Sequence, residues 1–577
     1  MEKTDENYLT GVPLILCTCS IILAIFVTAI DQSIVITALE GIEETFDSAS
    51  QIGWASSGYI LPMAVLALAW GKCGIVLGRK NSVLISLFLF ELGSVISAVS
   101  HNMSVFIAGR VITGIGAGGI QTNVFLISSE ITPLRQRGLV LGVVTMTLTP
   151  AAAIGPLIGG IFTDSKSLTW RWCFWINLPF GGIAALFLFF LYKPKHQLSK
   201  SFTRSNLSLE YFVKAFDLIG VTLISISLTL FLVGCSFGGE SADGFTKPLP
   251  LAFVIIGAVL FVVFIIFELF IFKIDESKEY YPMIPAFLIV KRQVLAPAFT
   301  ILFGNLVFFG ISMYVSIYFQ NLLGMSPKST GIHLLPMIIP TLLSTMTCGI
   351  IVSKVGIVKP VLILGAVLST IATGLMTLFN YNSSSGEKIG FIFLIGFAYG
   401  FYNQSGIIAA QLSNKENKAM YNLIITAFMA FSRSLGSALA GVIATAIYTS
   451  ISTKKIQSFP GYENDGLQTF LTNRANGTLT PDQFNIFKVS VTKGLRWVFF
   501  ACLIFGGLSL ISSLLCFNET VPIEKKPKTE DEEKTIEGAG ETTVDDENVP
   551  VPEPTTEAEL ELDHKVEAEA DKSQVQI

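Results

Sequence analysis

Three ionisable residues interrupt long apolar runs of the sequence. Asp31 lies in "FVTAIDQSIVITALEG" (26–41), Glu91 in "LFLFELGSV" (87–95), and Arg110 begins "RVITGIGAGG" (110–119). A charged side chain in the middle of a membrane helix costs about 2.5–3.5 kcal/mol, so such residues face a cavity or a partner. A carboxylate beside an arginine can exchange its partner for a proton or a cationic ligand. These residue types therefore indicate proton binding coupled to the movement of a charged molecule.

The depths of Asp31 and Arg110 in the predicted spans suggest that they share one site. At a rise of 1.5 Å per residue, Asp31 lies about 7 Å and Arg110 about 9 Å from the predicted outer surface. The alternative interpretation is a permanent structural ion pair. Glu91, near the middle of the third span, fits a structural or a functional role equally well. Arg433 in "AFMAFSRSLGSAL" (427–439) is either a packing donor, which we favour, or part of a second site.

Polar and aromatic residues in the apolar runs predict a substrate cavity. The candidates are Gln121, Asn123, Asn305, Asn403, Gln404, Trp54, Tyr59 and Tyr314. Amides can instead hydrogen-bond between helices, and Trp54 can belong to the interfacial aromatic belt. Glu268, near Lys273 at the end of a span, is expected to snorkel to the surface. No catalytic constellation, metal-ligand cluster or phosphate loop is present in the sequence, so we predict no enzyme and no cofactor, with a proton gradient as energy source.

The elements that position these residues are predicted to be transmembrane helices. The chain has 577 residues, of which 51% are hydrophobic and 14% charged, and its mean hydropathy is +0.63. Apolar runs of about 20 residues, each long enough to cross a bilayer, recur along it. We predict an all-α polytopic membrane protein with fourteen spans, at about 12–35, 54–70, 82–99, 104–128, 139–162, 173–192, 217–236, 250–271, 294–319, 330–352, 359–379, 389–410, 424–449 and 495–517.

The charges outside the spans predict the orientation. The loops on one side hold 17 Lys and Arg, against 5 in the short loops and 5 in the long loop at about 450–494 on the other, which places the first side and both termini in the cytosol. The segment 518–577 holds 19 acidic and 6 basic residues and no aromatic residue. Such a composition predicts a disordered acidic tail. Residues 1–11 form a short cytosolic N-terminus, and no cleavable signal peptide is expected.

Several motifs, in order along the chain, resemble those of the major facilitator superfamily. "GKCGIVLGRK" (71–80) resembles its loop motif, "RVITGIGAGG" its fourth-span motif, and "AAAIGPLIGGIF" (151–162) its antiporter motif. "AIDQSIVITAL" (29–39) and "TWRWCFWINLPFG" (169–181) are similar to signatures of the fourteen-span drug:proton antiporters. The finer resemblance is to the fungal branch that holds dye and drug exporters and vacuolar basic amino acid transporters.

The resemblance implies the major facilitator fold and alternating access. It predicts a six-helix bundle at 12–192, a linker with two inserted helices at 193–293, and a second bundle at 294–517 with an outer loop at 450–494. The motif positions are Gly71, Gly78, Arg79 and Lys80 in a cytosolic gate loop, and Gly155, Pro156, Gly159 and Gly160 in the antiporter motif. Ile75 and Val76 stand where the family has an acid and an arginine. Glu130, Arg135 and Arg137 are candidates for a replacement gate network.

The predicted function is proton-coupled antiport of cationic or amphipathic small molecules, of the drug and dye efflux type. A transporter of lysine, arginine or histidine with the same fold is the alternative. A membrane sensor that signals through its tail is an alternative of another class. We expect a monomer in the plasma membrane, or alternatively in the vacuolar membrane, with a small-molecule substrate, protons and lipid as its partners and no nucleic acid.

Overall fold

The computed structural model is built from helices. It describes residues 11–46, 54–132, 134–164, 168–192, 214, 216–240, 247–271, 282–325, 327–414, 419–463, 465–475 and 477–520. The first helices are α1 (Val12–Phe46), α2 (Trp54–Val65), α3 (Ala67–Val76), α4 (Arg79–Val99), α5 (Met103–Ile131), α6 (Leu134–Met146), α7 (Leu148–Asp164), α8 (Trp172–Trp175) and α9 (Asn177–Leu191). The predicted tail beyond residue 520 and the N-terminal residues 1–10 lie outside the described residues.

The second part of the chain continues the all-helical pattern. It contains α11 (Leu218–Glu240), α12 (Pro248–Ile266), the π-helix η3 (Phe267–Ile271), α13 (Ala286–Ile289), α14 (Arg292–Ile317), the π-helix η5 (Tyr318–Leu322), α15 (Pro327–Val355), α16 (Lys359–Met376), α17 (Ser385–Gln411), α18 (Ala419–Gln457), α19 (Leu467–Ala475) and α20 (Pro481–Leu514). Among the described residues no strand forms, and the only bridge joins Ile357 and Thr520. The prediction of an all-α polytopic protein is confirmed.

Within the described ranges, twelve helices are long and apolar enough to cross a membrane, or thirteen if the bent pair of α2 and α3 counts as one span. The predicted span at 139–162 is divided at Thr147 into α6, with 13 residues, and α7, with 17 residues. Each half is shorter than the roughly 20 residues that cross a bilayer alone. Counting α6 and α7 together as one further span would bring the thirteen to the predicted fourteen. The count of fourteen stays a prediction.

The outward faces of the helices are apolar, as contact with lipid requires. In the span at Pro248–Phe270 only 17% of the most apolar window is buried. Phe190 on α9 and Val259 on α12 are 66% and 56% exposed. Because no water is present in the hydrocarbon layer, helices can bury their backbone polar groups there and still present apolar side chains.

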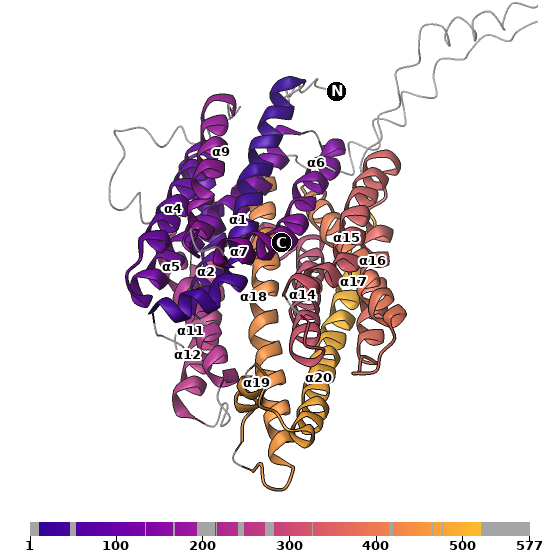
Figure 1. Ribbon diagram of the computed structural model, residues 1–577. Coiled ribbons are helices and arrows are strands. Elements are labelled where there is room, and N and C mark those ends of the chain that lie inside the picture. The colour runs from indigo at the N-terminus through magenta and orange to yellow at the C-terminus, as the bar shows by residue number, and fades with distance from the viewer. Residues whose placement is uncertain are drawn as a thin grey trace, which may run out of the picture. The chain divides into compact units, whose positions relative to one another are not determined.

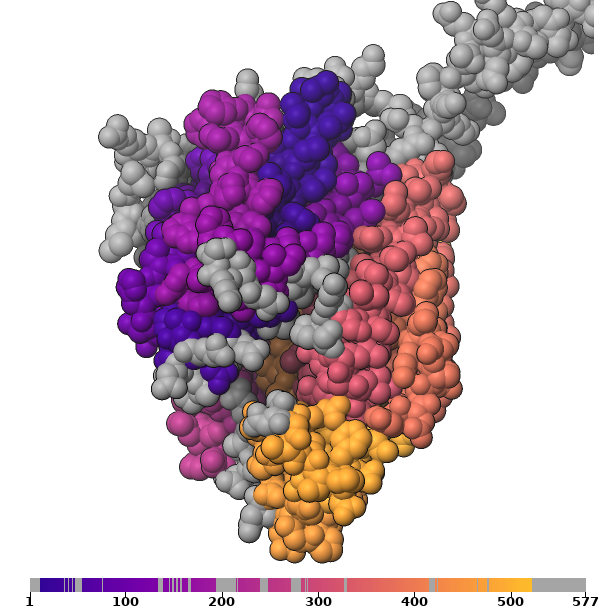
Figure 2. Space-filling view, in the orientation of Figure 1, coloured from indigo at the N-terminus to yellow at the C-terminus, as the bar shows by residue number. Residues whose placement is uncertain are grey.

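Helices from distant parts of the sequence pack side by side (Figure 1). α1 contacts α7, α9 and α5, whereas α14 contacts α18, α20 and α17. α18 also contacts α2, α3, α5 and α11 of the earlier part, and α6 packs against α15. Figure 2 shows the face along which the earlier helices, coloured indigo to magenta, adjoin the salmon surface of α15. The predicted bundle limits at 12–192 and 294–517 stay a prediction.

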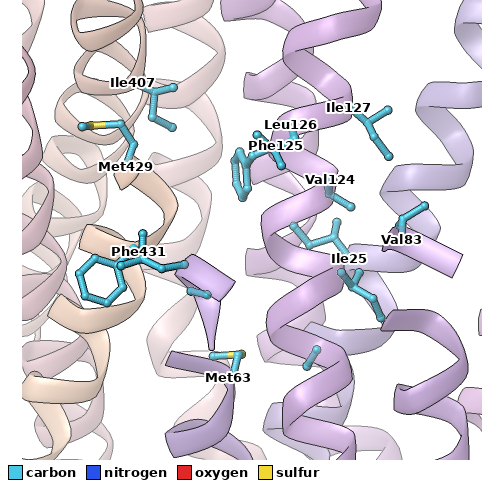
Figure 3. Close-up of a cluster of buried hydrophobic side chains, with 14 of the residues drawn as sticks. Ile25, Met63, Val83, Val124, Phe125, Leu126, Ile127, Ile407, Met429 and Phe431 are labelled. Carbon is cyan, nitrogen blue, oxygen red and sulfur yellow. The ribbon is translucent and has the colours of Figure 1, made fainter. Parts of the chain in front are cut away.

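One buried apolar cluster crosses this contact. It includes Phe125 of α5, Ile407 of α17 and Met429 of α18. Figure 3 shows Phe125 on the side of α5 that faces Ile407 and Met429. Side chains of the earlier helix α5 and of the later helices α17 and α18 therefore pack together in one apolar cluster.

Candidate functional site

The structure brings Asp31 and Arg110 into direct contact. Arg110 Nη1 donates a hydrogen bond to Asp31 Oδ2 at 2.6 Å, and the two side chains are 1% and 0% exposed. Arg110 Nε also donates to the Ala55 carbonyl oxygen at 3.0 Å. A charge-assisted hydrogen bond of this length, shielded from water, holds α1 against α5.

Asn177, which the sequence did not single out, completes the shell around Asp31. Its Nδ2 donates to Asp31 Oδ1 at 2.7 Å and to Ser94 Oγ at 3.1 Å. Both carboxylate oxygens of Asp31 are therefore hydrogen-bonded. Asn177 belongs to the motif stretch "WINLPF". The motif therefore marked the residue, but the sequence did not indicate that it contacts Asp31.

The ring of Tyr59 lies against the guanidinium of Arg110. The guanidinium carbon of Arg110 lies 4.5 Å from the Tyr59 ring centroid, and the Tyr59 hydroxyl donates to the Thr28 carbonyl oxygen at 2.9 Å. Phe174 adds a second ring at 5.5 Å. Aromatic faces attract a cation. The site thus joins α1, α2, α5 and α9 around one ion pair.

Glu91 lies next to this site rather than in it. It is on α4, one turn before Ser94, and both of its carboxyl oxygens are buried without a hydrogen-bond partner among the described residues. Gly181 of α9 faces it, and a Cβ at that position would overlap Glu91 Oε1. Glu91 therefore occupies a space that only a glycine leaves open, close to the hydrogen-bonded group of Ser94, Asn177 and Asp31.

The predicted cavity residues of α5 face two different neighbours. Asn123 Nδ2 donates to Ser82 Oγ at 2.9 Å and to the Gly119 carbonyl oxygen at 2.8 Å, so its amide nitrogen serves the contact between α4 and α5. Gln121 Oε1 accepts from Ser434 Oγ of α18 at 3.3 Å. Gln121 thus lies where the earlier and later helices meet, and Asn123 does not.

Four of the remaining predicted cavity residues lie on the later helices, and Trp54 lies at the start of α2. Asn305 Oδ1 accepts from the Tyr399 hydroxyl at 3.3 Å, and Asn305 Nδ2 donates to the Ile301 carbonyl oxygen at 2.7 Å. Asn403 and Gln404 are buried on α17. The Tyr314 hydroxyl is 3.1 Å from Thr445 Oγ1. Trp54 packs against Phe237 of α11 with the ring centroids 6.2 Å apart, and it directly precedes Ala55, whose carbonyl oxygen accepts from Arg110.

Arg79 of the predicted gate loop forms an ion pair, although the acid of the family motif is replaced by Ile75. Arg79 pairs with Glu130 at the end of α5, and the Tyr192 hydroxyl donates to Glu130 Oε2 at 2.5 Å. Gly78 has a φ of +80°, which favours glycine, and Lys80 Nζ donates to the Phe189 carbonyl oxygen. Glu130 therefore gives Arg79 a carboxylate, although Ile75 stands at the family's acidic position. The side chains of Arg135 and Arg137 lie outside the described residues.

The helices are tightly closed at this end. A Cβ on Gly71 would lie 2.5 Å from Ala427 Cβ of α18. Gln411 Nε2 of α17 donates to Ser129 Oγ of α5 at 3.1 Å. At the end that carries the gate loop, the earlier and later helices are therefore in van der Waals and hydrogen-bonding contact.

A second group of charges lies near the inserted helices. Glu268 is 2% exposed and its Oε2 accepts from the Ile284 backbone N–H at 3.0 Å. Asp217, 1% exposed, accepts from the backbone N–H groups of Gly220 and Met283. Lys72 interacts electrostatically with both acids. The expectation that Glu268 reaches the surface was wrong, because the backbone N–H of Ile284 and the charge of Lys72 stabilise its carboxyl group inside.

The antiporter motif lies on α7 against α1. A Cβ on Gly159 would lie 2.6 Å from the Ile34 carbonyl oxygen, and one on Gly155 would overlap Ser33, two residues after Asp31. Gly160 faces open space, and the Pro156 side chain lies outside the described residues. Two of the four motif residues thus determine how closely α7 approaches the helix that carries Asp31.

Comparison with known proteins identifies the family. The model of the Major Facilitator Superfamily matches residues 21–249 and 212–441. The chain belongs to this superfamily. Its architecture agrees with solved major facilitator structures: the proton:xylose symporter XylE aligns with a TM-score of 0.54 at 13% identity, covering 87% of this chain and 94% of that one. The human organic anion transporter MFSD10 aligns with a TM-score of 0.55 at 14% identity, covering 88% and 100%.

Major facilitator relatives with higher identity are fungal. Vacuolar basic amino acid transporter 5 of Saccharomyces cerevisiae is 32% identical over 90% of this chain and 93% of its own length. Azole resistance protein 1 of the same species is 31% identical over 86% and 87%. The Aspyridones efflux protein of Neocamarosporium betae is 33% identical over 78% and 77%. As a major facilitator protein, the chain is a multi-span membrane transporter of small molecules.

Proposed function

We propose that this transporter is a proton-coupled antiporter and that Asp31 is its proton-binding group. The observation that carries the proposal is the buried pair of Asp31 and Arg110, whose Nη1–Oδ2 distance is 2.6 Å. Both hydrogen bonds that the Asp31 carboxylate accepts from the described residues come from side chains of other helices, Arg110 of α5 and Asn177 of α9. A change in the charge of Asp31 therefore alters the contacts that α1 makes with α5 and α9.

Protonation of Asp31 changes what Arg110 contacts. A neutral carboxyl group attracts the guanidinium much less than a carboxylate does, and Arg110 then keeps the Ala55 carbonyl oxygen and the Tyr59 ring. Loss of the ion pair also weakens the contact of α1 with α5, so the protonated and the deprotonated transporter differ in how these helices pack. A substrate bound between the two bundles would then meet a different conformational equilibrium in each protonation state, which is the requirement for antiport.

Glu91 is proposed as a second proton carrier. Its buried carboxyl oxygens have no hydrogen-bond partner among the described residues, and Ser94, one turn further along α4, contacts Asn177. A proton on Glu91 removes the cost of burying an unpaired charge. We propose that Glu91 exchanges protons with Asp31 through this polar group.

Alternating access would then move two six-helix bundles, 12–192 and 294–517, against each other within a monomer. The contacts between Gly71 and Ala427 and between Gln411 and Ser129 must separate to open the predicted cytosolic end. The ion pair of Arg79 and Glu130 stabilises that end within the first bundle. The charge of Asp31 biases this equilibrium through α5, because that helix carries Arg110 beside Asp31 as well as Ser129 and Glu130 at the closed end.

The proposed substrates are cationic or amphipathic small molecules of the drug and dye type, moved across the plasma membrane. The names of Azole resistance protein 1 and the Aspyridones efflux protein support this choice. The second candidate is a basic amino acid transporter of the vacuolar membrane. It is favoured by the relative that covers 90% of this chain.

The test is transport by the full-length protein in vesicles with and without a pH gradient. Asp31→Asn is expected to abolish gradient-driven flux of rhodamine 6G or lysine. Exchange of the same compound at equal pH on both sides should continue, because exchange needs no net proton movement. Asp482→Asn, which alters an exposed acid at the start of α20, is the matched control and should behave as the wild type. Unchanged gradient-driven flux in Asp31→Asn would contradict the proposal.

A further inference from the structure

Arg433 is a buried arginine of α18 without a counter-ion. It is 5% exposed, and both Nη1 and Nη2 are buried without a hydrogen-bond partner among the described residues. The salt bridges found in the described part of the chain involve Arg79 and Arg110 only. The Arg433 guanidinium has five N–H donors, and no acid among the described residues forms a salt bridge with it.

The groups around Arg433 come from both parts of the chain. Its guanidinium carbon lies 4.0 Å from the centroid of the Phe125 ring of α5, and it interacts electrostatically with the Tyr399 hydroxyl of α17. Tyr399 in turn donates to Asn305 of α14. Ser434, the next residue of α18, contacts Gln121 of α5. The arginine thus lies at the contact of α5, α17 and α18, which is the surface that alternating access must open.

The proton-binding pair lies too far away to neutralise Arg433. Arg110 and Phe125 are 15 residues apart on α5, which corresponds to about 22 Å along the helix at 1.5 Å per residue. Asp31 is hydrogen-bonded to Arg110 at the far end of that distance. The two arginines therefore belong to separate sites, and a single lysine-sized molecule does not reach both in this conformation.

An unpaired guanidinium in this environment is costly. Burying a charge without a partner is strongly unfavourable, and one aromatic face offsets only a part of that cost. An anion that entered when α5 and α18 separate would remove it. A carboxylate matches best, because its two oxygens accept two parallel hydrogen bonds from the guanidinium fork.

We infer that Arg433 binds the carboxylate of the transported substrate. The inference rests on the proposed transport function and specifies its substrate class: small molecules that carry a carboxylate, either zwitterionic or acidic, rather than purely cationic compounds. Phe125 covers the guanidinium in this closed conformation, and Tyr399 and Asn305 supply further polar contacts. A permanent cation without a carboxylate is repelled by Arg433.

The experiment compares matched pairs of compounds that differ in the carboxylate alone. The pairs are lysine with lysinamide and rhodamine 19 with its ethyl ester rhodamine 6G, measured as flux into vesicles that hold the full-length protein. The wild type is expected to prefer the acid of a transported pair by about tenfold or more, as the loss of a charge-assisted hydrogen-bond pair requires. Arg433→Gln should lose that preference through a higher KM for the acid, and Arg433→Lys should keep part of it.

Controls separate binding from folding. Arg292→Gln removes an exposed arginine from the same part of the chain, where Arg292 Nε donates to the Leu515 carbonyl oxygen, and should keep the wild-type preference. Thermal stabilisation of the wild-type protein by each compound supplies a readout that needs no variant: the acid should raise the melting temperature more than the amide or ester.

The outcomes distinguish the inference from the proposed function. An acid preference that survives in Arg433→Gln overturns the inference. The inference is also overturned if the wild type transports only the amide or the ester. If that flux still depends on Asp31, the antiport proposal stands. Flux that keeps its Arg433-dependent acid preference but ignores Asp31 overturns the antiport proposal and leaves the inference intact.

Discussion

The two buried arginines of this transporter differ in one respect. Arg110 and Arg433 are 1% and 5% exposed, and each guanidinium lies over an aromatic ring, Tyr59 at 4.5 Å and Phe125 at 4.0 Å. Arg110 also has a carboxylate at 2.6 Å, whereas Arg433 has no acid among the described residues. The proposals therefore assign the proton to the paired site and the substrate carboxylate to the unpaired guanidinium.

In the proposed antiport, the two arginines would divide the tasks in space. The ion pair of α1 and α5 would respond to protonation within the earlier helices. The Arg433 guanidinium of α18 lies where those helices meet the later ones, so the movement proposed for alternating access would release or enclose a substrate bound there. The coupling between them would pass along α5, which contacts both sites.

The largest expected effect comes from removing each arginine in turn. Arg110→Met leaves Asp31 buried without its counter-ion and should lower the free energy of unfolding by about 3–5 kcal/mol. Arg433→Met removes a charge that has no partner, so stability should stay equal or rise. Thermal unfolding of both purified variants in detergent measures this contrast. Equal losses of stability would mean that Arg433 has a counter-ion after all.

A smaller effect is expected from the amides beside the two sites. Asn177→Ala removes a hydrogen bond to the charged Asp31 and should cost about 1.5–3 kcal/mol. Asn305→Ala removes hydrogen bonds between neutral groups and should cost about 0.5–1.5 kcal/mol. The same unfolding measurement ranks the two variants. A larger loss for Asn305→Ala would contradict the assignment of the charged site to the earlier helices.

A third comparison concerns the glycines that hold α1 near α7. Gly159→Ala places a Cβ 2.6 Å from the Ile34 carbonyl oxygen and should cost about 1–3 kcal/mol by overpacking. Gly160→Ala, one residue away, meets open space and should be neutral or slightly stabilising. Equal stability of the two variants would show that α1, with Asp31, is free to move away from α7.

Much of the proton site was predictable from the sequence. An acid and an arginine at similar depths in two apolar runs led to the hypothesis that Asp31 and Arg110 share a site, and the structure has them in contact. Asn177 was quoted in a motif but was not assigned a role, because an amide in an apolar stretch has too many alternative partners. Whether the pair carries protons stays a prediction.

The later helices were harder to interpret. Packing was the favoured role for Arg433, and the absence of a neighbouring acid became visible only when α5, α17 and α18 were placed around it. Asn123 and Gln121 are two residues apart on α5, yet one faces α4 and the other faces α18. Glu268 was expected at the surface and is buried beside Asp217.

The sequence by itself determined the class of protein, the membrane-spanning character of its helices and the few positions where a charge enters the membrane. Composition and run length suffice for this, because a bilayer imposes the same length and apolarity on every span. Only the tertiary structure decided which of those charges have partners. A helix that is apolar on every side carries no signal for its own rotation, since lipid and protein interior are equally apolar, and that rotation decides what each side chain meets.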